Sequence, residues 1–152
     1  MNAESEVKPK VITIIGATGI GKTYAVYANN PCVYAPNYGK YGVQRVGIWE
    51  EFQTILFLDN FYGQLPLAEL VRIMEGGGVY VNTRTGGKRI YFRTVIIAGC
   101  SFPHHWYRPR GTPKRMTELD SLYRLLGVGT PNFIAASTRA ELNARLALAG
   151  PL

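Results

Sequence analysis

The eight residues 16–23 constrain the fold of this 152-residue chain more than any other segment. They read GATGIGKT, which satisfies every fixed position of the phosphate-binding P-loop pattern. A short β-branched run at 11–15 precedes them, and a helix-compatible stretch at 22–28 follows. The segment therefore predicts a strand, a phosphate-binding loop and a helix, in that order. The alternative, an ordinary glycine-rich turn, gives no reason for Lys followed by Thr at these positions.

Each residue type in this segment has a physical role in holding phosphate. The glycines allow successive backbone N–H groups to face phosphate oxygens, and the start of the helix adds a positive dipole. Lys22 neutralises phosphate charge, and Thr23 can ligate Mg²⁺. We therefore expect ATP, or a similar nucleotide, and Mg²⁺ to bind here. The residues of this expected site are Gly16, Ala17, Thr18, Gly19, Ile20, Gly21, Lys22 and Thr23.

A second apolar run supplies the acid that such a site requires. Residues 54–58 predict a strand buried on both faces, with Asp59 at its carboxyl end. In P-loop proteins an Asp at this place holds the Mg²⁺ that bridges the phosphates. Asp59 is therefore a candidate Mg²⁺ ligand together with Thr23, although an Asp at a strand end can also have no such role.

The remaining chain alternates between strand and helix signals. Residues 94–98 predict another buried strand, and a short strand is expected around 32–34. The segment 108–115 is rich in basic side chains. Helices are expected at 66–74, which starts with Pro, at 119–126, and at 138–148 with Ser137 as its cap.

A basic hairpin is predicted between residues 79 and 93. Its arms, 79–82 and 89–93, flank a turn in which Gly86 and Gly87 would supply positive backbone angles. Four basic side chains on it could contact a phosphate backbone, although a solvated basic surface fits the sequence equally well. These candidates for nucleic-acid contacts are Arg84, Lys88, Arg89 and Arg93.

Composition limits the classes of function. Hydrophobic residues make up 47% of the chain and charged residues 18%, which argues against disorder. The net charge of +7 favours a polyanionic partner without identifying it. Cys32 and Cys100 have neither the spacing of a metal site nor that of a disulfide framework. No apolar run approaches the roughly 20 residues of a membrane span, so we expect a soluble intracellular protein.

From residue 10 to about residue 126 the chain resembles the superfamily 3 helicase domain of replication-associated proteins from circoviruses and related small circular single-stranded DNA viruses. The segment 57–66, FLDNFYGQLP, carries the resemblance best. In that family the Walker B strand is similarly followed by an aromatic pair, a Gly and a helix that starts with Leu-Pro. Further similar segments are the hairpin at 83–89, the motif C segment at 95–100 with Pro103, Trp106 and Tyr107 downstream, and the arginine-finger segment at 122–124.

The resemblance implies an α/β fold, a three-layer P-loop ATPase of the AAA+-like kind with a central, mostly parallel sheet and a β-hairpin insertion. It implies a ring-forming helicase that hydrolyses ATP to move on single-stranded DNA, with Arg124 reaching a neighbour's nucleotide. RNA stays open as the partner, because helicases of small RNA viruses share this architecture. The viral analogy alone implies the host nucleus. The chain divides into a polar segment at 1–10, the ATPase domain at 11–126 and a divergent tail with a helix at 127–152.

Three positions depart from the family's pattern. Asn60 stands where the family has a second acid, and an amide cannot accept a proton from the attacking water. Cys100 replaces the Asn that senses the terminal phosphate, and Leu125 replaces a second Arg. Asn60 and Cys100 occupy catalytic positions of the family's pattern, as do the loop lysine, the Mg²⁺-binding acid and the arginine-finger residue. The candidate catalytic residues are Lys22, Asp59, Asn60, Cys100 and Arg124.

Two other functions fit the sequence. The chain could be a catalytically impaired relic or accessory subunit that binds nucleotide and nucleic acid. It could also be a small P-loop kinase with 108–115 as a phosphate-covering lid, although the segment 59–66 argues against this. The family's DNA-nicking chemistry is not expected, since His104 and His105 are adjacent rather than alternating and no Tyr stands three residues before a Lys.

Overall fold

The computed structural model describes residues 8–28, 30–44, 47–107 and 113–150. The strands are β1 (Lys10–Gly16), β2 (Val33–Tyr34), β3 (Tyr38–Gly39), β4 (Gly42–Val43), β5 (Ile55–Leu58), β6 (Val79–Thr83), β7 (Gly86–Ile90), β8 (Thr94–Gly99) and β9 (Phe133–Ala136). The helices are α1 (Lys22–Tyr27), α2 (Leu67–Met74), α3 (Pro113–Leu125) and α4 (Arg139–Ala149), with a 3₁₀ turn at Pro103–His105. None of these described helices is long and apolar enough to cross a bilayer.

The central sheet is parallel throughout and has the strand order β2-β5-β8-β1-β9. β8 lies in the middle, with its Ile96 opposite Ile12 of β1 and Phe57 of β5. Every residue of β5 and β8 is buried. Burial on both faces explains why these strands read as continuous apolar runs in the sequence. The expected α/β fold with a central parallel sheet is confirmed.

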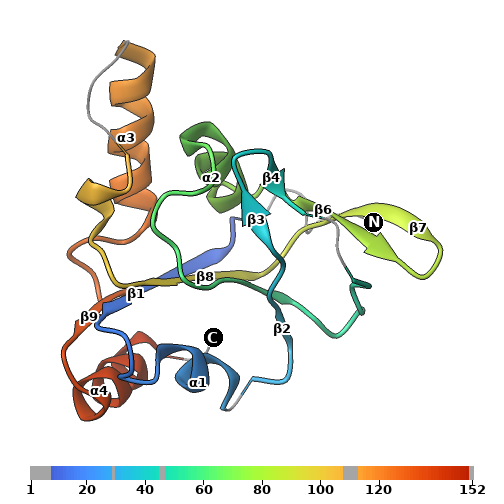
Figure 1. Ribbon diagram of the computed structural model, residues 1–152. Coiled ribbons are helices and arrows are strands. Elements are labelled where there is room, and N and C mark those ends of the chain that lie inside the picture. Colours follow the sequence, from blue (N-terminus) through green and yellow to red (C-terminus); the bar gives the residue numbers. More distant parts are fainter. Residues whose placement is uncertain (1–7, 29, 45–46, 108–112, 151–152) are drawn as a thin grey trace.

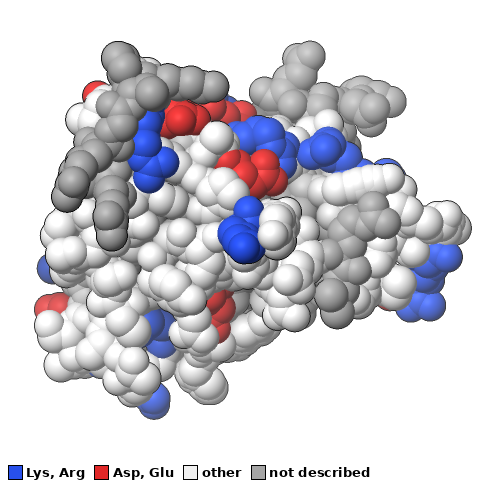
Figure 2. Space-filling model, turned by 45° about the horizontal axis from the view of Figure 1, so that its top comes forward, with Lys and Arg blue, Asp and Glu red and all other residues white. Residues whose placement is uncertain are grey.

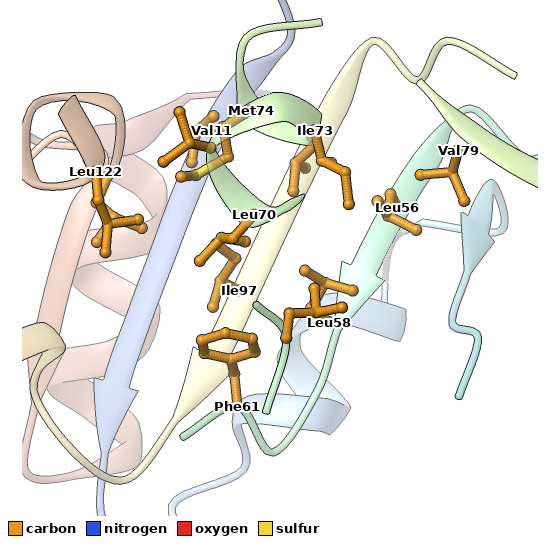
Figure 3. Packing of buried hydrophobic residues seen from close by; sticks show 14 of the residues in the cluster. Val11, Leu56, Leu58, Phe61, Leu70, Ile73, Met74, Val79, Ile97 and Leu122 are labelled. Carbon is orange, nitrogen blue, oxygen red and sulfur yellow. The ribbon is translucent and has the colours of Figure 1, made fainter. Parts of the chain in front are cut away.

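Helices cover both faces of this sheet, α2 and α3 on one and α1 and α4 on the other (Figure 1). Side chains alternate between the faces along each strand, so two separate hydrophobic clusters form. Leu70 of α2 lies over Ile97 of β8 (Figure 3). The neighbouring Ile96 belongs to the opposite cluster, with Val26 of α1 and Leu142 of α4. The arrangement has three layers. Adjacent residues of one strand pack against helices on opposite faces of the sheet.

The predicted hairpin is present as β6 and β7, which form an antiparallel sheet of their own at the side of the molecule (Figure 1). Its turn is tighter than expected, because Thr83 pairs directly with Gly86. Gly86 has the expected positive φ, 125°. The expectation for Gly87 was wrong, since this residue lies within β7. A Cβ at Gly87 would come within 2.7 Å of the Tyr80 hydroxyl oxygen, so the glycine leaves room for that side chain.

The C-terminal segment contributes a strand that the sequence did not predict. β9 pairs in parallel with β1, with Ile134 opposite Ile14. Ile134 is fully buried in the cluster beneath α1 and α4. The described part of 127–152, treated above as a divergent tail, therefore completes the central sheet and covers one of its faces.

Two predicted helix starts were wrong. α4 begins after Thr138, whose Oγ1 accepts a hydrogen bond from the backbone N–H of Glu141 at 3.1 Å, so Thr138 rather than Ser137 is the cap. α3 begins at Pro113, several residues before the predicted start at 119. Its first turns are polar and show no apolar periodicity, while Pro at the first helical position has a backbone angle suited to a helix.

Candidate nucleotide-binding site

The predicted site residues meet at the carboxyl ends of β1, β5 and β8. These strands are neighbours and parallel, so their carboxyl ends lie at one edge of the sheet. After β1 the chain enters α1 on one face, whereas after β8 it leads to α3 on the other (Figure 1). Such a reversal between adjacent parallel strands opens a crevice, and ligands of open α/β sheets bind there.

Lys22 lies against the loop that precedes it. Its Nζ donates hydrogen bonds to the backbone carbonyls of Gly16 at 2.7 Å and Ala17 at 2.8 Å. The side chain is buried although it carries a charge, with Lys22 only 8% exposed. Gly19 and Gly21, both with φ of 91°, let the loop turn around this ammonium group. The positive charge is thereby held at the centre of the loop rather than in solvent.

Thr23, the second residue of α1, and Asp59, directly after β5, meet directly. The Thr23 hydroxyl donates a hydrogen bond to Asp59 Oδ2 at 2.8 Å. The second carboxylate oxygen, Oδ1, accepts one from the backbone N–H of Asn60 at 2.9 Å. The Tyr38 hydroxyl donates to the backbone carbonyl of Asp59. Burial, and then the charge of Asp59, raise the pKa of Tyr38 above its ordinary value, so the phenol stays a neutral donor.

The oxygens of Thr23 and Asp59 are suitable ligands for Mg²⁺, which takes only a few of its ligands from the protein. They are too few for a metal ion whose ligands must all come from protein side chains. Among the described residues no group of three or more His, Cys, Asp or Glu side chains is placed to hold a metal ion. Mg²⁺ is usually bound through one or two carboxylates together with substrate phosphates and waters. One hydroxyl and one carboxylate in contact, beside a loop of the phosphate-binding pattern, fit that description.

The two unusual residues, Asn60 and Cys100, also lie at this site. Cys100 Sγ is 3.3 Å from the Thr18 hydroxyl and 3.7 Å from Lys22 Nζ. Asn60 follows Asp59 with a positive φ of 54°, which Asn adopts more readily than most residues. Its backbone carbonyl accepts a hydrogen bond from the Gln64 amide at 2.8 Å, so this loop is internally braced. The structure thus brings Lys22, Asp59, Asn60 and Cys100 together within one chain.

Arg124 is not part of this cluster. It lies in the last turn of α3 and is exposed, and its guanidinium donates to the Ser121 hydroxyl at 3.3 Å. No hydrogen bond joins it to the Lys22 and Asp59 cluster among the described residues. The structure therefore does not place Arg124 in the cluster formed by Lys22 and Asp59.

The hairpin does not present its basic residues as one cluster. Arg84, near the tip, forms an ion pair with Glu50 at 2.6 Å, which neutralises its charge. Lys88 lines a groove with Trp49 and Phe52 beside that pair. Figure 2 shows Lys and Arg side chains gathered at the outer end of the hairpin, with acidic residues among the basic ones elsewhere.

The other two basic residues lie toward the base of the hairpin or beyond it. Arg89 donates to the backbone carbonyl of Gly77 at 3.2 Å. Arg93 follows β7, and its backbone N–H donates to the Thr54 carbonyl at 3.1 Å beside the central sheet. The four residues predicted to contact nucleic acid are thus divided between the two ends of the hairpin.

Residues important to the site's shape were missed by sequence reasoning. Tyr38, which holds the Asp59 backbone, comes from a segment rich in Tyr, Gly and Pro with no periodic pattern. Arg139 of α4 lies beside Gly21 of the loop, although the two are 118 positions apart in sequence. No local signal could have found either contact. Of the proposed kinase lid, Arg108 and Arg110 lie outside the described residues, while Arg115 lies over the Tyr107 ring at 5.8 Å.

Comparison with known proteins gives relatives of one kind. No protein-family model matches the chain. It is 30% identical to the replication-associated protein of Goose circovirus over 103 residues, which are 66% of this chain and 33% of that protein. The corresponding protein of Porcine circovirus 1 is 29% identical over 119 residues, 77% of this chain and 36% of the relative. The replication-associated protein of Porcine circovirus 2 is 27% identical over 122 residues, which are 77% of this chain and 35% of that protein.

These matches cover about one third of each relative's length. They agree with the resemblance seen in the sequence, which was carried by the loop at 16–23 and the segment at 57–66. Over the part that matches, the chain is similar to circovirus replication-associated proteins.

Proposed function

We propose that this chain binds Mg²⁺ and ATP, or a similar nucleotide, at residues 16–23 and hydrolyses the nucleotide to move on single-stranded DNA during viral-type replication. One observation carries the proposal: the hydroxyl of Thr23 and the carboxylate of Asp59 lie 2.8 Å apart. The two residues are 36 positions apart in sequence. Their contact, next to the buried ammonium of Lys22, gathers the groups that nucleotide phosphates and Mg²⁺ require.

The residues of the site would divide the work as follows. Lys22 would transfer its hydrogen bonds from the carbonyls of Gly16 and Ala17 to phosphate oxygens, where its charge offsets theirs. Thr23 and Asp59 would hold Mg²⁺, which supplies neutralisation of the phosphate charge. The backbone N–H of Asn60 and the hydroxyl of Tyr38 would keep Asp59 in place while it does so.

The remainder of the proposal concerns partners. The curated relatives are named replication-associated proteins, which supports a nucleic-acid substrate. Lys88 at the outer part of the hairpin would contact the phosphate backbone, and Arg84 would do so if the nucleic acid displaced Glu50. Assembly into a ring would bring Arg124 to a neighbour's nucleotide, which matches its exposed place in the last turn of α3. RNA in place of DNA is the alternative substrate.

A second candidate function is nucleotide binding without useful turnover. Asn60 favours it, because no carboxylate follows Asp59 to accept the proton of an attacking water. Cys100 favours it too, because its thiol is only a weak hydrogen-bond partner beside Thr18 and Lys22. On this reading the loop and Asp59 still bind the nucleotide and the chain acts as an accessory subunit.

ATP turnover with Mg²⁺, measured with and without single-stranded DNA, separates the two candidates, and Lys22→Ala is the control. Turnover that rises with DNA and disappears in Lys22→Ala supports the motor. Absent turnover together with retained ATP binding contradicts the motor and supports the accessory function. Single-stranded RNA in place of DNA shows which nucleic acid stimulates the reaction.

A further inference from the structure

A groove opens beside the phosphate-binding loop, between α1 and α4. Its volume is about 680 Å³, within the range of about 300–1,000 Å³ typical of small-molecule sites. Its walls include Gly21, the last loop residue before Lys22, and Arg139 near the start of α4. The groove therefore begins where the loop ends.

The walls of this groove combine an aromatic ring with apolar and amide groups. Tyr24 of α1 is 70% exposed although its neighbour Val26 is fully buried. Aromatic rings exposed in this way stack on the faces of nucleobases. Asn143 stands on the same walls, and its side-chain amide offers both hydrogen-bond donors and acceptors. Asn30 also lines the groove; its amide already donates to the Val26 carbonyl at 2.9 Å, which leaves its oxygen and one N–H for a ligand. The apolar remainder of the wall is formed by Ala25, Ala28, Leu146 and Ala147.

Arg139 links this groove to the loop. Its guanidinium carbon lies 6.0 Å from the centre of the Tyr24 ring, a cation–π distance. Its Nε and Nη2 lie 3.1 Å and 3.2 Å from the point that a Cβ at Gly21 would occupy. A positive charge thus stands between the loop and the aromatic wall.

We infer that this groove is the base-binding part of the nucleotide site, with the base on Tyr24 and its edge toward Asn30 and Asn143. The inference rests on the proposed nucleotide binding and adds the substrate class, a nucleoside triphosphate recognised by its base as well as by its phosphates. Arg139 and Asn143 come from α4, which lies beyond the segment that resembles the viral helicase domain. The C-terminal segment is then part of the nucleotide site.

Binding of Mg²⁺–ATP and of inorganic tripolyphosphate, compared by calorimetry on the full chain, tests this inference. Tripolyphosphate can use the loop but not the groove. In Tyr24→Ala and Asn143→Ala we expect ATP affinity to fall by about 5- to 10-fold or more, from lost stacking and a lost hydrogen bond, and tripolyphosphate affinity to stay unchanged. Tyr41→Ala is the matched control, since Tyr41 is 92% exposed and is not among the groove's walls.

The outcomes separate this inference from the function on which it rests. If both ligands bind but Tyr24→Ala and Asn143→Ala weaken ATP no more than Tyr41→Ala does, the groove is not the base site, and phosphate binding stands. Equal losses for ATP and tripolyphosphate would also overturn it, since the substitutions would then act on the loop. If neither ligand binds the unaltered chain, the proposed nucleotide binding itself is wrong.

Discussion

Replacing Gly99 with Ala tests how closely the segment after Asp59 packs on β8. Gly99 is the last residue of β8, and a Cβ there would lie 2.2 Å from the backbone carbonyl oxygen of Phe61, whereas real Cβ contacts stay beyond 3.0 Å. Because the obstacle is backbone, no rotamer change can relieve it. The segment must move away, although the Phe61 N–H donates to Ala98 O at 2.8 Å and the Phe61 ring packs on Trp106.

The size of the effect follows from these contacts. Overpacking of a well-packed core costs about 1–3 kcal/mol, and a weakened hydrogen bond adds about 1 kcal/mol. We therefore expect Gly99→Ala to lower the free energy of unfolding by about 2–4 kcal/mol. Gly39→Ala is the matched control, because a Cβ at Gly39 meets nothing within 4 Å and its φ is not positive. That substitution should be neutral or stabilise by up to about 1 kcal/mol.

Urea unfolding followed by tryptophan fluorescence measures both variants, with the free energy of unfolding extrapolated to water. If Gly99→Ala were as stable as Gly39→Ala, the expected clash would be absent and the segment after Asp59 would not rest on β8. Asp59 and Asn60 lie directly before Phe61, so a shift of this segment should also weaken ATP binding.

Three further predictions concern a cap, a buried hydroxyl and a candidate catalytic position. Thr138→Ala should destabilise the chain by about 1 kcal/mol in the urea assay through loss of the α4 cap, and an equal loss in Ser137→Ala would contradict this assignment. Thr13→Val should cost about 1–2 kcal/mol, because the fully buried Thr13 hydroxyl donates to the Leu126 carbonyl at 3.2 Å; unchanged stability would show that this bond contributes nothing. Asn60→Asp should raise ATP turnover by up to about 10²-fold by restoring a proton acceptor, and unchanged turnover with retained ATP binding would mean that Asn60 does not limit hydrolysis.

Much of the sheet and the loop could be predicted because their signals are local. Residues 55–58 and 95–98 are apolar without interruption, as is typical of strands buried on both faces. The loop at 16–23 has a fixed pattern, and Asp59 marks a strand end. The carboxyl ends of parallel strands lie at one edge of a sheet. Thr23 follows β1 and Asp59 follows β5, and only β8 lies between these two strands, so the strand order brings the two residues together.

The parts that could not be predicted depend on contacts between distant segments. β9 has only four residues, two of them Ala, and its burial comes from pairing with β1. The ion pair of Arg84 with Glu50 spans 34 positions, so counting basic residues on the hairpin overstated its free charge. Arg139 reaches Gly21 only because α4 packs on the same face as α1. Sequence periodicity carries no information on such pairs.

Calorimetric titration of the chain with ATP in the presence of Mg²⁺ tests whether residues 16–23 bind a nucleotide, with Lys22→Ala and Lys40→Ala compared under the same conditions. Lys22 lies on the loop, whereas Lys40 lies over the Tyr41 ring in the β3–β4 turn. We predict that ATP binds, that Lys22→Ala weakens binding by about 10- to 100-fold through loss of a charged hydrogen-bond donor, and that Lys40→Ala leaves the affinity unchanged. No binding to the unaltered chain, or equal binding by all three proteins, would contradict a nucleotide site at residues 16–23.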